Sequence, residues 1–472
     1  MIKNFFLELD VFFQERKKII ILGFLLALYL PFINLPPYYD DEIRFTYGVI
    51  GLFEQGRIIP DLFFRFVTAA QVADVYIFNL VFCALLSLIL FKLKYFKENY
   101  FLFIVVFSNA FLMENLSYHV DIIGMMMAYI FGIYAAFYEN TDLKKMFLIS
   151  FLLSSFSLIC YQSSLNIFAT SVVCVGVLDW IHHKKTFRSN LIVRILAYVS
   201  MIIFSKVILI TIGIFLKWYG GDIGRLHYVE KRSTFDLFAF NEQIQRYVFL
   251  IYDSLNVTQL SIIALLICSF VFIRKHFYYY FLTLFICGFL IFFPYVFVDA
   301  FRLVQPRVLY GFGGFLLLIY IWLYYSTDHL CFKNVINLMF LIYSIIFLCS
   351  VSAYSNSYQK AIELESNVYK KIADTLNNTD DVVMQRCGFN TMIFNTKYVA
   401  VNATAFPIIR NVIRSSTSHL VRRTQGIYDL NNLNFIAQRC TYKTLVSKEL
   451  ILNDRYYHLY KLDDKKYQIV YK

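Results

Sequence analysis

The stretch Ile122–Tyr138 reads IIGMMMAYIFGIYAAFY and contains no charged side chain. A membrane-spanning helix needs roughly 17–25 mostly apolar residues, so this stretch is long enough to cross a bilayer. Comparable apolar blocks occur at Ile19–Leu35, Val75–Phe91 and Phe277–Val298. Because lipid offers no hydrogen-bond partners to the backbone, such blocks must form helices. The sequence therefore predicts a mainly α-helical, polytopic membrane bundle.

The composition points the same way. Of the 472 residues, 59% are hydrophobic and 16% are charged, whereas soluble domains carry about a quarter charged residues. The net charge is +12, and membrane proteins concentrate Lys and Arg in their cytoplasmic loops. Since topology accounts for the basic charge, we expect no nucleic-acid partner.

About eleven spans are expected from the apolar blocks. Basic residues precede the first block at Arg16, Lys17 and Lys18 and recur in alternate loops, which places the N-terminus in the cytoplasm. An odd number of spans then places the C-terminus on the periplasmic side of a bacterial inner membrane. The spans not yet named fall at 100–113, 146–160, 165–181, 191–216, 258–273, 308–325 and 334–353.

The character of the chain changes after Tyr354. Residues 1–354 form the predicted membrane domain, and residues 355–472 form a small α/β domain in the periplasm. Glu363–Asn377 has helical spacing of apolar residues. Alternating patterns predict strands at Lys397–Ala403, Tyr456–Lys461 and Tyr467–Tyr471. Cys387 and Cys440 both fall in this domain and could form a disulfide if their Cα atoms come close enough.

Polar residues gather in the loops that this topology places outside the cytoplasm. The first loop follows Pro36-Pro37, which ends the first span. A plain hairpin would need few polar residues, but four of these loops carry acids, amides and arginines. The candidate residues are Asp40, Asp41, Glu42 and Arg44 in the first loop, Glu114, Asn115, Tyr118, His119 and Asp121 in the second, Gln162 and Asn166 in the third, and Arg302 and Arg307 in the fifth.

Together these loops would surround one cavity at the outer face. The arginines could hold a phosphate, because a guanidinium matches phosphate oxygens in a bidentate way. A carboxylate among apolar walls, Asp40 or Asp41, could act as a base, and the amides and the imidazole could bind sugar hydroxyls. The alternative to a shared cavity is that each loop is polar only because its tip is exposed to water. Asp40, Asp41 and Glu42 could bind a divalent cation, although we do not expect the site to require a metal or other cofactor.

Lys206 interrupts an apolar span, where a central Lys costs about 2.5–3.5 kcal/mol on insertion scales. It either snorkels to the interface or faces the cavity and pairs with a lipid-linked phosphate.

The loop motifs resemble those of bacterial and phage-type O-antigen glucosyltransferases, the enzymes that convert serotype. The resemblance rests on Tyr38–Arg44, Met113–Asp121, Tyr161–Asn166 and Gln305–Val308 in that order, and it does not extend beyond Ser355. It implies a GT-C-like membrane glycosyltransferase that takes a sugar, glucose in this family, from a polyprenyl-phosphate donor. The acceptor implied is O-antigen polysaccharide, with a first-loop acid as the catalytic base. The family pattern leads us to expect a basic residue near position 119, where this chain has His.

Three other functions remain open. A transporter or flippase of a lipid-linked glycan predicts polar residues in both membrane halves. An O-antigen polymerase or ligase predicts a large Arg-rich central loop. A scaffold gives no reason for the polar loops. In the tail, Arg410, Arg414, Arg422 and Arg423 form either a solvated face on anionic lipid or part of an acceptor groove.

Overall fold

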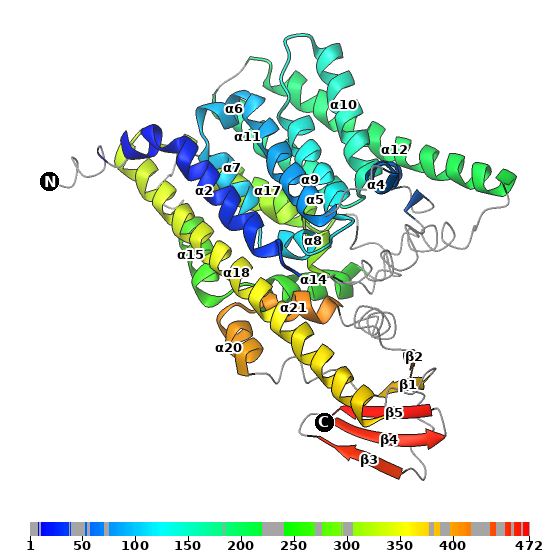
Figure 1. The fold of residues 1–472 in the computed structure, drawn as a ribbon. Helices are drawn as coiled ribbons and strands as arrows, with labels where there is room; N and C mark the ends of the chain where they lie inside the picture. Colours follow the sequence, from blue (N-terminus) through cyan, green and yellow to red (C-terminus); the bar gives the residue numbers. More distant parts are fainter. Residues whose placement is uncertain are drawn as a thin grey trace.

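The computed structural model describes residues 8, 11–36, 38, 52–53, 57–69, 75–182, 185–219, 240–269, 276–293, 295, 305–376, 382–387, 397–416, 435–439, 449–454, 457–463 and 466–471. The chain forms a helical body followed by a long helix that carries a small sheet (Figure 1). The helices of the body are α2 (Lys17–Tyr29), η1 (Leu30–Phe32), α4 (Ile58–Ala69), α5 (Val75–Ser87), η3 (Leu88–Lys92), α6 (Lys94–Glu98), α7 (Phe101–Phe107), α8 (Leu112–Leu116), α9 (Ile122–Phe137), α10 (Leu143–Cys160), α11 (Ser164–Ile181), α12 (Phe187–Tyr219), α14 (Phe240–Ser254), α15 (Val257–Ser269), α16 (Phe277–Leu290), η7 (Pro306–Val308) and α17 (Gly311–Tyr325).

The core of the body lies around α9 and α17. The helix α9 packs against α5, α10 and α11, while α17 packs against α7, α11 and α16. Close approach of α17 depends on Gly313, because a Cβ atom there would clash with Tyr129 Oη and lie 2.8 Å from the carbonyl oxygen of Val106. Tyr129 donates its hydroxyl to that same carbonyl. Small residues therefore set the spacing of the central helices, as is common where membrane helices pack.

Several helices are apolar and long enough to cross a membrane. Among the described helices, α10, α11, α12 and the apolar part of the long helix after α17 meet this condition, and the bent pair α14 and α15 would make a fifth span. Apolar helices of 10–17 residues also occur, namely Tyr76–Lys92, α9, α16 and α17. At 1.5 Å per residue the shorter ones reach about 20–25 Å, less than the ~30 Å of a bilayer core.

By length and composition, four or five spans are supported among the described residues, and the predicted number of about eleven is not clearly reached. The range 100–113 contains α7, which has seven residues, and every one of them is buried; it is about 10 Å long and cannot cross a membrane by itself. The range 258–273 begins as α15, which is bent by 111° from α14. The other predicted spans each coincide with an apolar helix or helix pair.

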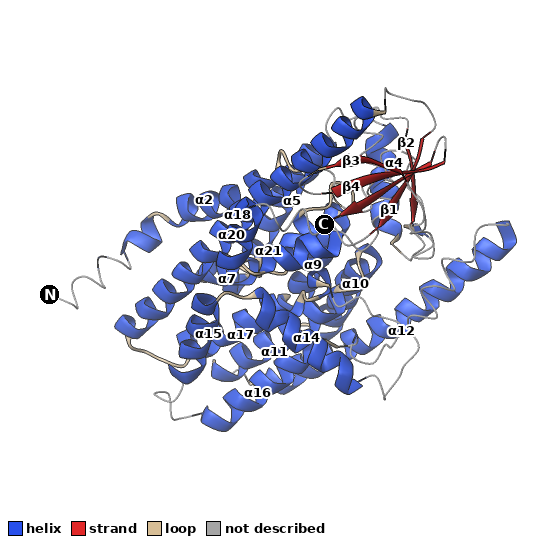
Figure 2. Ribbon diagram, turned by 90° about the horizontal axis from the view of Figure 1, so that it is seen from below, coloured by secondary structure: helices blue, strands red, loops and turns tan. Residues whose placement is uncertain are grey.

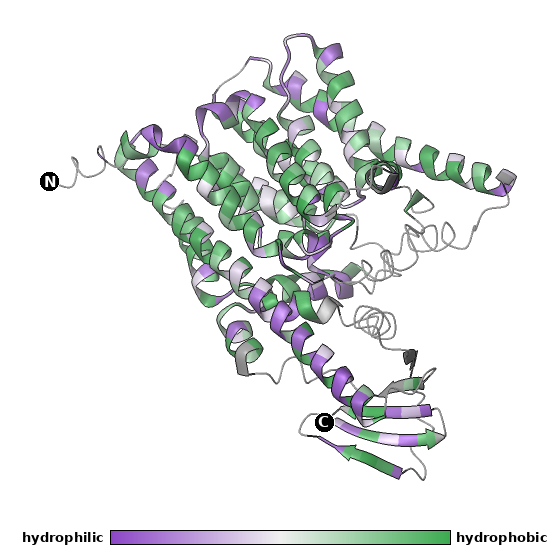
Figure 3. Cartoon of the chain, in the orientation of Figure 1, coloured by the Kyte–Doolittle hydropathy of each residue, from purple (hydrophilic) through white to green (hydrophobic). Residues whose placement is uncertain are grey.

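The long helix α18 (Leu330–Thr375) passes without a break through the predicted boundary between residues 354 and 355. Its first half is apolar and packs on the body, and its second half is polar (Figure 3). The predicted helix Glu363–Asn377 is confirmed as the last part of α18, up to Thr375. No Gly or Pro interrupts α18, so the change of surroundings produces no change of secondary structure.

A five-stranded sheet lies at the C-terminal end of α18 (Figures 1 and 2). The strands are β1 (Val382–Cys387), β2 (Phe435–Arg439), β3 (Glu449–Asn453), β4 (Tyr457–Asp463) and β5 (Lys466–Tyr471). Their order is β2-β1-β5-β4-β3, with β1 parallel to β2 and β5 and the other neighbours antiparallel. Met384, Leu459 and Ile469 pack on Tyr369 and Ile372 of α18 in a separate core. The predicted strands at Tyr456–Lys461 and Tyr467–Tyr471 are confirmed.

The predicted strand at Lys397–Ala403 is wrong, because this segment forms the helix α20 (Lys397–Ala405). Val399 and Ala403, four residues apart, are both buried, and this spacing places them on one helix face. The next helix, α21 (Ile408–Ser416), buries Ile408, Ile409, Val412 and Ile413 in the core of the helical body. The tail thus contributes two helices to the body as well as a separate sheet.

Candidate functional site

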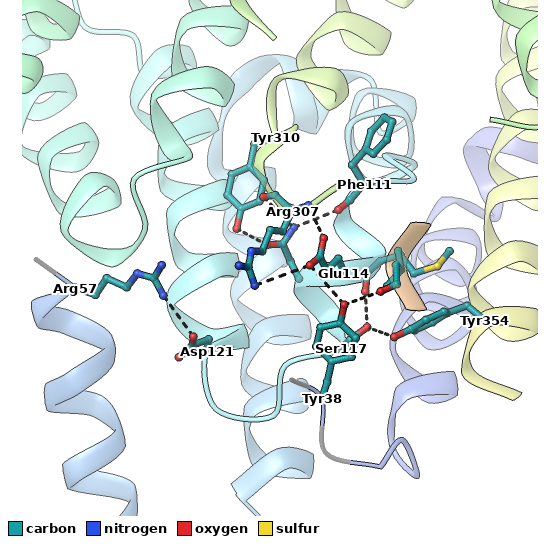
Figure 4. Close-up of polar contacts among 12 residues, drawn as sticks. Tyr38, Arg57, Phe111, Glu114, Ser117, Asp121, Arg307, Tyr310 and Tyr354 are labelled. Atoms are coloured by element: carbon teal, nitrogen blue, oxygen red, sulfur yellow. Dashed lines mark hydrogen bonds and ion pairs between the residues drawn. The ribbon is translucent and has the colours of Figure 1, made fainter. Parts of the chain in front are cut away.

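Glu114 lies at the centre of a buried polar network. Its carboxylate is fully buried on the short helix α8. Oε2 accepts the backbone N–H of Arg307 at 2.9 Å, and Oε1 lies 3.9 Å from Nη1 of the same residue. The Arg307 guanidinium lies over the Tyr118 ring, 5.5 Å from its centroid. The second and fifth predicted loops therefore meet through a carboxylate and a guanidinium (Figure 4).

Amide side chains hold the backbone around this ion pair. Asn115 Nδ2 donates to the Phe111 carbonyl at 3.2 Å and to the Arg307 carbonyl at 3.5 Å. Tyr310 Oη lies 3.2 Å from Asn115 Oδ1 and 3.0 Å from the Met125 carbonyl oxygen, so one proton serves two acceptors. Asn166 Nδ2 donates to the carbonyls of Ile291 and Val308 at 2.7 and 3.2 Å. The amide N–H groups of Asn115 and Asn166 are thus engaged with backbone and position the site.

A second ion pair joins the start of α4 to the start of α9. Arg57 Nη1 lies 3.4 Å from Asp121 Oδ2, and the side chains are 20% and 5% exposed. The guanidinium carbon of Arg57 lies over the Tyr161 ring, 4.7 Å from its centroid. Each of the two arginines, Arg57 and Arg307, therefore lies on a tyrosine face and beside one buried carboxylate.

Tyr38 connects the first loop to both the second loop and the tail. Its ring is fully buried, in edge contact with the Tyr118 ring at 4.9 Å. Its hydroxyl donates to the Val412 carbonyl of α21 at 2.8 Å and lies 3.4 Å from Glu114 Oε1. Burial, and next the nearby Glu114 charge, raises the pKa of Tyr38 well above its ordinary value, so this phenol stays a protonated donor. Burial likewise raises the pKa of Tyr161, against the opposing effect of the Arg57 charge.

His119 packs away from the ion pairs, against α5. Its ring stacks on Tyr76 with centroids 3.6 Å apart and planes 4° apart. Its backbone carbonyl accepts Asn79 Nδ2 at 2.7 Å. His119 as a whole is 7% exposed, so in this structure its ring forms part of the packing between the second loop and α5.

The structure brings together most of the predicted residues that it describes. Glu114, Asn115, Tyr118, Asp121 and Arg307 lie in or beside the two ion-paired groups. Gln162 follows Tyr161 and is partly buried. Lys206 lies midway along α12 with an exposed side chain, on the outer surface of the body and not within the buried network. Asp40, Asp41, Glu42, Arg44 and Arg302 lie outside the described residues.

Several residues of the network were not predicted as site residues. Tyr38 and Tyr161 stand in the quoted loop motifs and Arg57 follows the first of them, but phenols and a lone Arg carry weak signals beside runs of acids. Ser117 and Tyr354, whose hydroxyls are 2.8 Å apart, link the second loop to α18. Only a three-dimensional arrangement identifies such partners. Within the described ranges, no group of three or more His, Cys, Asp or Glu is placed to hold a metal ion.

These features define a helical protein of membrane type, with paired arginines and carboxylates buried at one end of its bundle. Residues 19–318 match the family model of the glucosyl transferase GtrII. Since this match covers more than half of the chain, the protein belongs to the GtrII glucosyl transferase family, and the predicted resemblance is confirmed. The match ends before α18, as the loop motifs did. No curated protein and no solved structure matches the chain.

Proposed function

We propose that this glucosyltransferase moves glucose from a polyprenyl phosphate carrier to O-antigen polysaccharide on the periplasmic face of the bacterial inner membrane. The observation that carries the proposal is the family match over the segment that holds Glu114, Asp121 and both arginines. The proposal keeps the predicted orientation, a cytoplasmic N-terminus with the polar loops and the tail outside, and the predicted GT-C-like architecture.

The reaction replaces one bond to the anomeric carbon of glucose by another. A base takes the proton of an acceptor hydroxyl while its oxygen forms a bond to that carbon. The bond from the anomeric carbon to the phosphate oxygen breaks, and its electron pair stays on the leaving polyprenyl monophosphate. We assign the base to Asp40 or Asp41, which follow the buried Tyr38 by two and three residues in the chain. Arg307 is suited to the phosphate, because a guanidinium can donate two parallel hydrogen bonds to it.

The roles of base and phosphate ligand can be separated by kinetics. Asp40→Asn or Asp41→Asn keeps side-chain size but removes a base, so kcat should fall by about 10²–10⁴-fold with little change in the donor KM. Arg307→Ala should instead raise the donor KM and keep some turnover at high donor concentration. Full activity in both Asn variants at normal expression would show that the base lies elsewhere.

The alternative function, transport of a lipid-linked glycan, predicts functional polar groups in both halves of the bundle. One buried ion pair does lie toward the other end of α11, where Arg194 Nη1 and Asp179 Oδ2 are 3.1 Å apart. Tyr95 and Asn190 also donate to the Asp179 carboxylate, and this cluster ties α6, α11 and α12 together. A transporter would move labelled polyprenyl phosphoglucose across vesicles without forming a new glycosidic bond, which distinguishes the two functions.

A further inference from the structure

Arg57 lies at the edge of the site and has no role in the reaction as proposed so far. It immediately precedes α4, and its side chain is four-fifths buried. Burying a guanidinium costs several kcal/mol unless charge and hydrogen bonds compensate. Its contact with Asp121 is 3.4 Å, longer than the ~2.7–2.9 Å of a strong charge-assisted hydrogen bond. Arg65, which lies within α4, contacts Asp61 at 2.7 Å.

Arg57 and Arg307 face the same space. Figure 4 shows the two guanidinium groups pointing toward one another, one from the residue before α4 and one from η7, with Asp121 below them. Contacts between the described residues agree with this view. The Tyr161 ring under Arg57 lies 5.7 Å from the Tyr310 ring, and the Tyr310 hydroxyl contacts Asn115, which donates to the Arg307 carbonyl.

Tyr161 lies within electrostatic range of both Arg57 and Glu114. The charge of Arg57 opposes the burial that raises the pKa of Tyr161, and Glu114 adds to that rise. Arg57 therefore lies within electrostatic range of the rings that border the Glu114–Arg307 pair. Two guanidinium groups that face one space suit an anion that carries more than one negative charge.

We propose that Arg57 binds the phosphate of the polyprenyl donor opposite Arg307, and that Asp121 is the counter-ion of Arg57 when the site is empty. This assignment rests on the proposed glucosyltransferase function and adds a second phosphate ligand to it. When the bond between the anomeric carbon and the phosphate oxygen breaks, the phosphate gains a negative charge, and Arg57 stabilises the leaving group. The position predicts opposite effects for the two members of the ion pair.

The test measures binding of sugar-free polyprenyl phosphate to the purified full-length protein in lipid nanodiscs. Arg57→Gln should weaken this binding roughly ten- to a hundredfold, the usual cost of a charged hydrogen-bonding partner. Asp121→Asn should leave it at least as tight as in the wild type, because it removes the competing carboxylate. Arg65→Gln, two turns further along α4, is the matched control and should bind like the wild type. Inorganic phosphate should compete weakly, because it lacks the lipid chain.

Equal weakening by Arg57→Gln and Asp121→Asn would overturn the proposal, since a mere brace between α4 and α9 would respond in this way. Unchanged binding in Arg57→Gln would also overturn it, as would competition by inorganic phosphate at the same concentration as polyprenyl phosphate. If Arg57→Gln does not fold, Arg57→Lys retains the charge without the planar fork and should bind with intermediate affinity; wild-type affinity in Arg57→Lys would contradict a bidentate contact. Binding needs no glucose, so a protein that binds the lipid through Arg57 but transfers nothing would refute the proposed function alone.

Discussion

Glu114 holds the second loop and the fifth loop together through its contacts with Arg307. Its carboxylate is fully buried and accepts the backbone N–H of Arg307. Glu114→Ala should therefore destabilise the protein by about 1–3 kcal/mol, because the Arg307 N–H and guanidinium lose a buried acceptor. The thermal unfolding midpoint in detergent measures this effect. Glu98→Ala, an exposed acid beside Lys94, is the control, and an equal midpoint in the two variants would contradict the central place of Glu114.

The sequence identified the loops of the site better than the contacts within them. Glu114 and Arg307 were both predicted as site residues, but their contact joins positions 193 residues apart, which no periodicity reveals. Tyr38 and Arg57 were missed for the same reason, because their partners Val412 and Asp121 lie far along the chain. Asn166 was also predicted as a site residue, and its amide N–H groups donate to the backbone carbonyls of Ile291 and Val308, which lie far along the chain.

At the scale of elements, apolar blocks predicted helices well and spans less well. The blocks give correct helix positions because the backbone must satisfy its hydrogen bonds in any apolar environment. However, a helix that is buried by neighbouring helices shows the same pattern of apolar residues as a helix that is surrounded by lipid. The helix α7 is buried by its neighbours. Lys397–Ala403 alternates like a strand but packs as α20, because contact with α18 outweighs local preference.

We expect the helix α21 to support the site by holding Tyr38 in place, although α21 lies beyond the family match. Ile409 is fully buried in the helical body, so Ile409→Asp buries a charge and should detach α21. We expect at least about a tenfold loss of glucose transfer and faster protease cleavage near residue 409. Val401→Asp on the exposed face of α20 is the control. Adding Tyr38→Phe to Ile409→Asp should cost little more, because both changes break the same Tyr38–Val412 contact; additive losses would show that Tyr38 and α21 act separately.

At the scale of the whole molecule, the two ends of the bundle should face different compartments. A reporter that is active only outside the cytoplasm should be active when fused after Lys472. It should be inactive after Lys185, between α11 and α12, because the basic residues there are expected in the cytoplasm. The reverse pattern would place Glu114 and both arginines on the cytoplasmic side and would contradict a periplasmic reaction.

We propose that this chain transfers glucose from a polyprenyl carrier. The most direct measurement is the incorporation of labelled glucose into lipopolysaccharide by membranes that contain the protein, with either polyprenyl phosphoglucose or UDP-glucose as the donor. Matched membranes without the protein give the background, and the membranes are kept free of enzymes that convert one donor into the other. We expect incorporation from polyprenyl phosphoglucose alone. Incorporation from UDP-glucose alone, or from neither donor in membranes that contain folded protein and the correct acceptor, would contradict it.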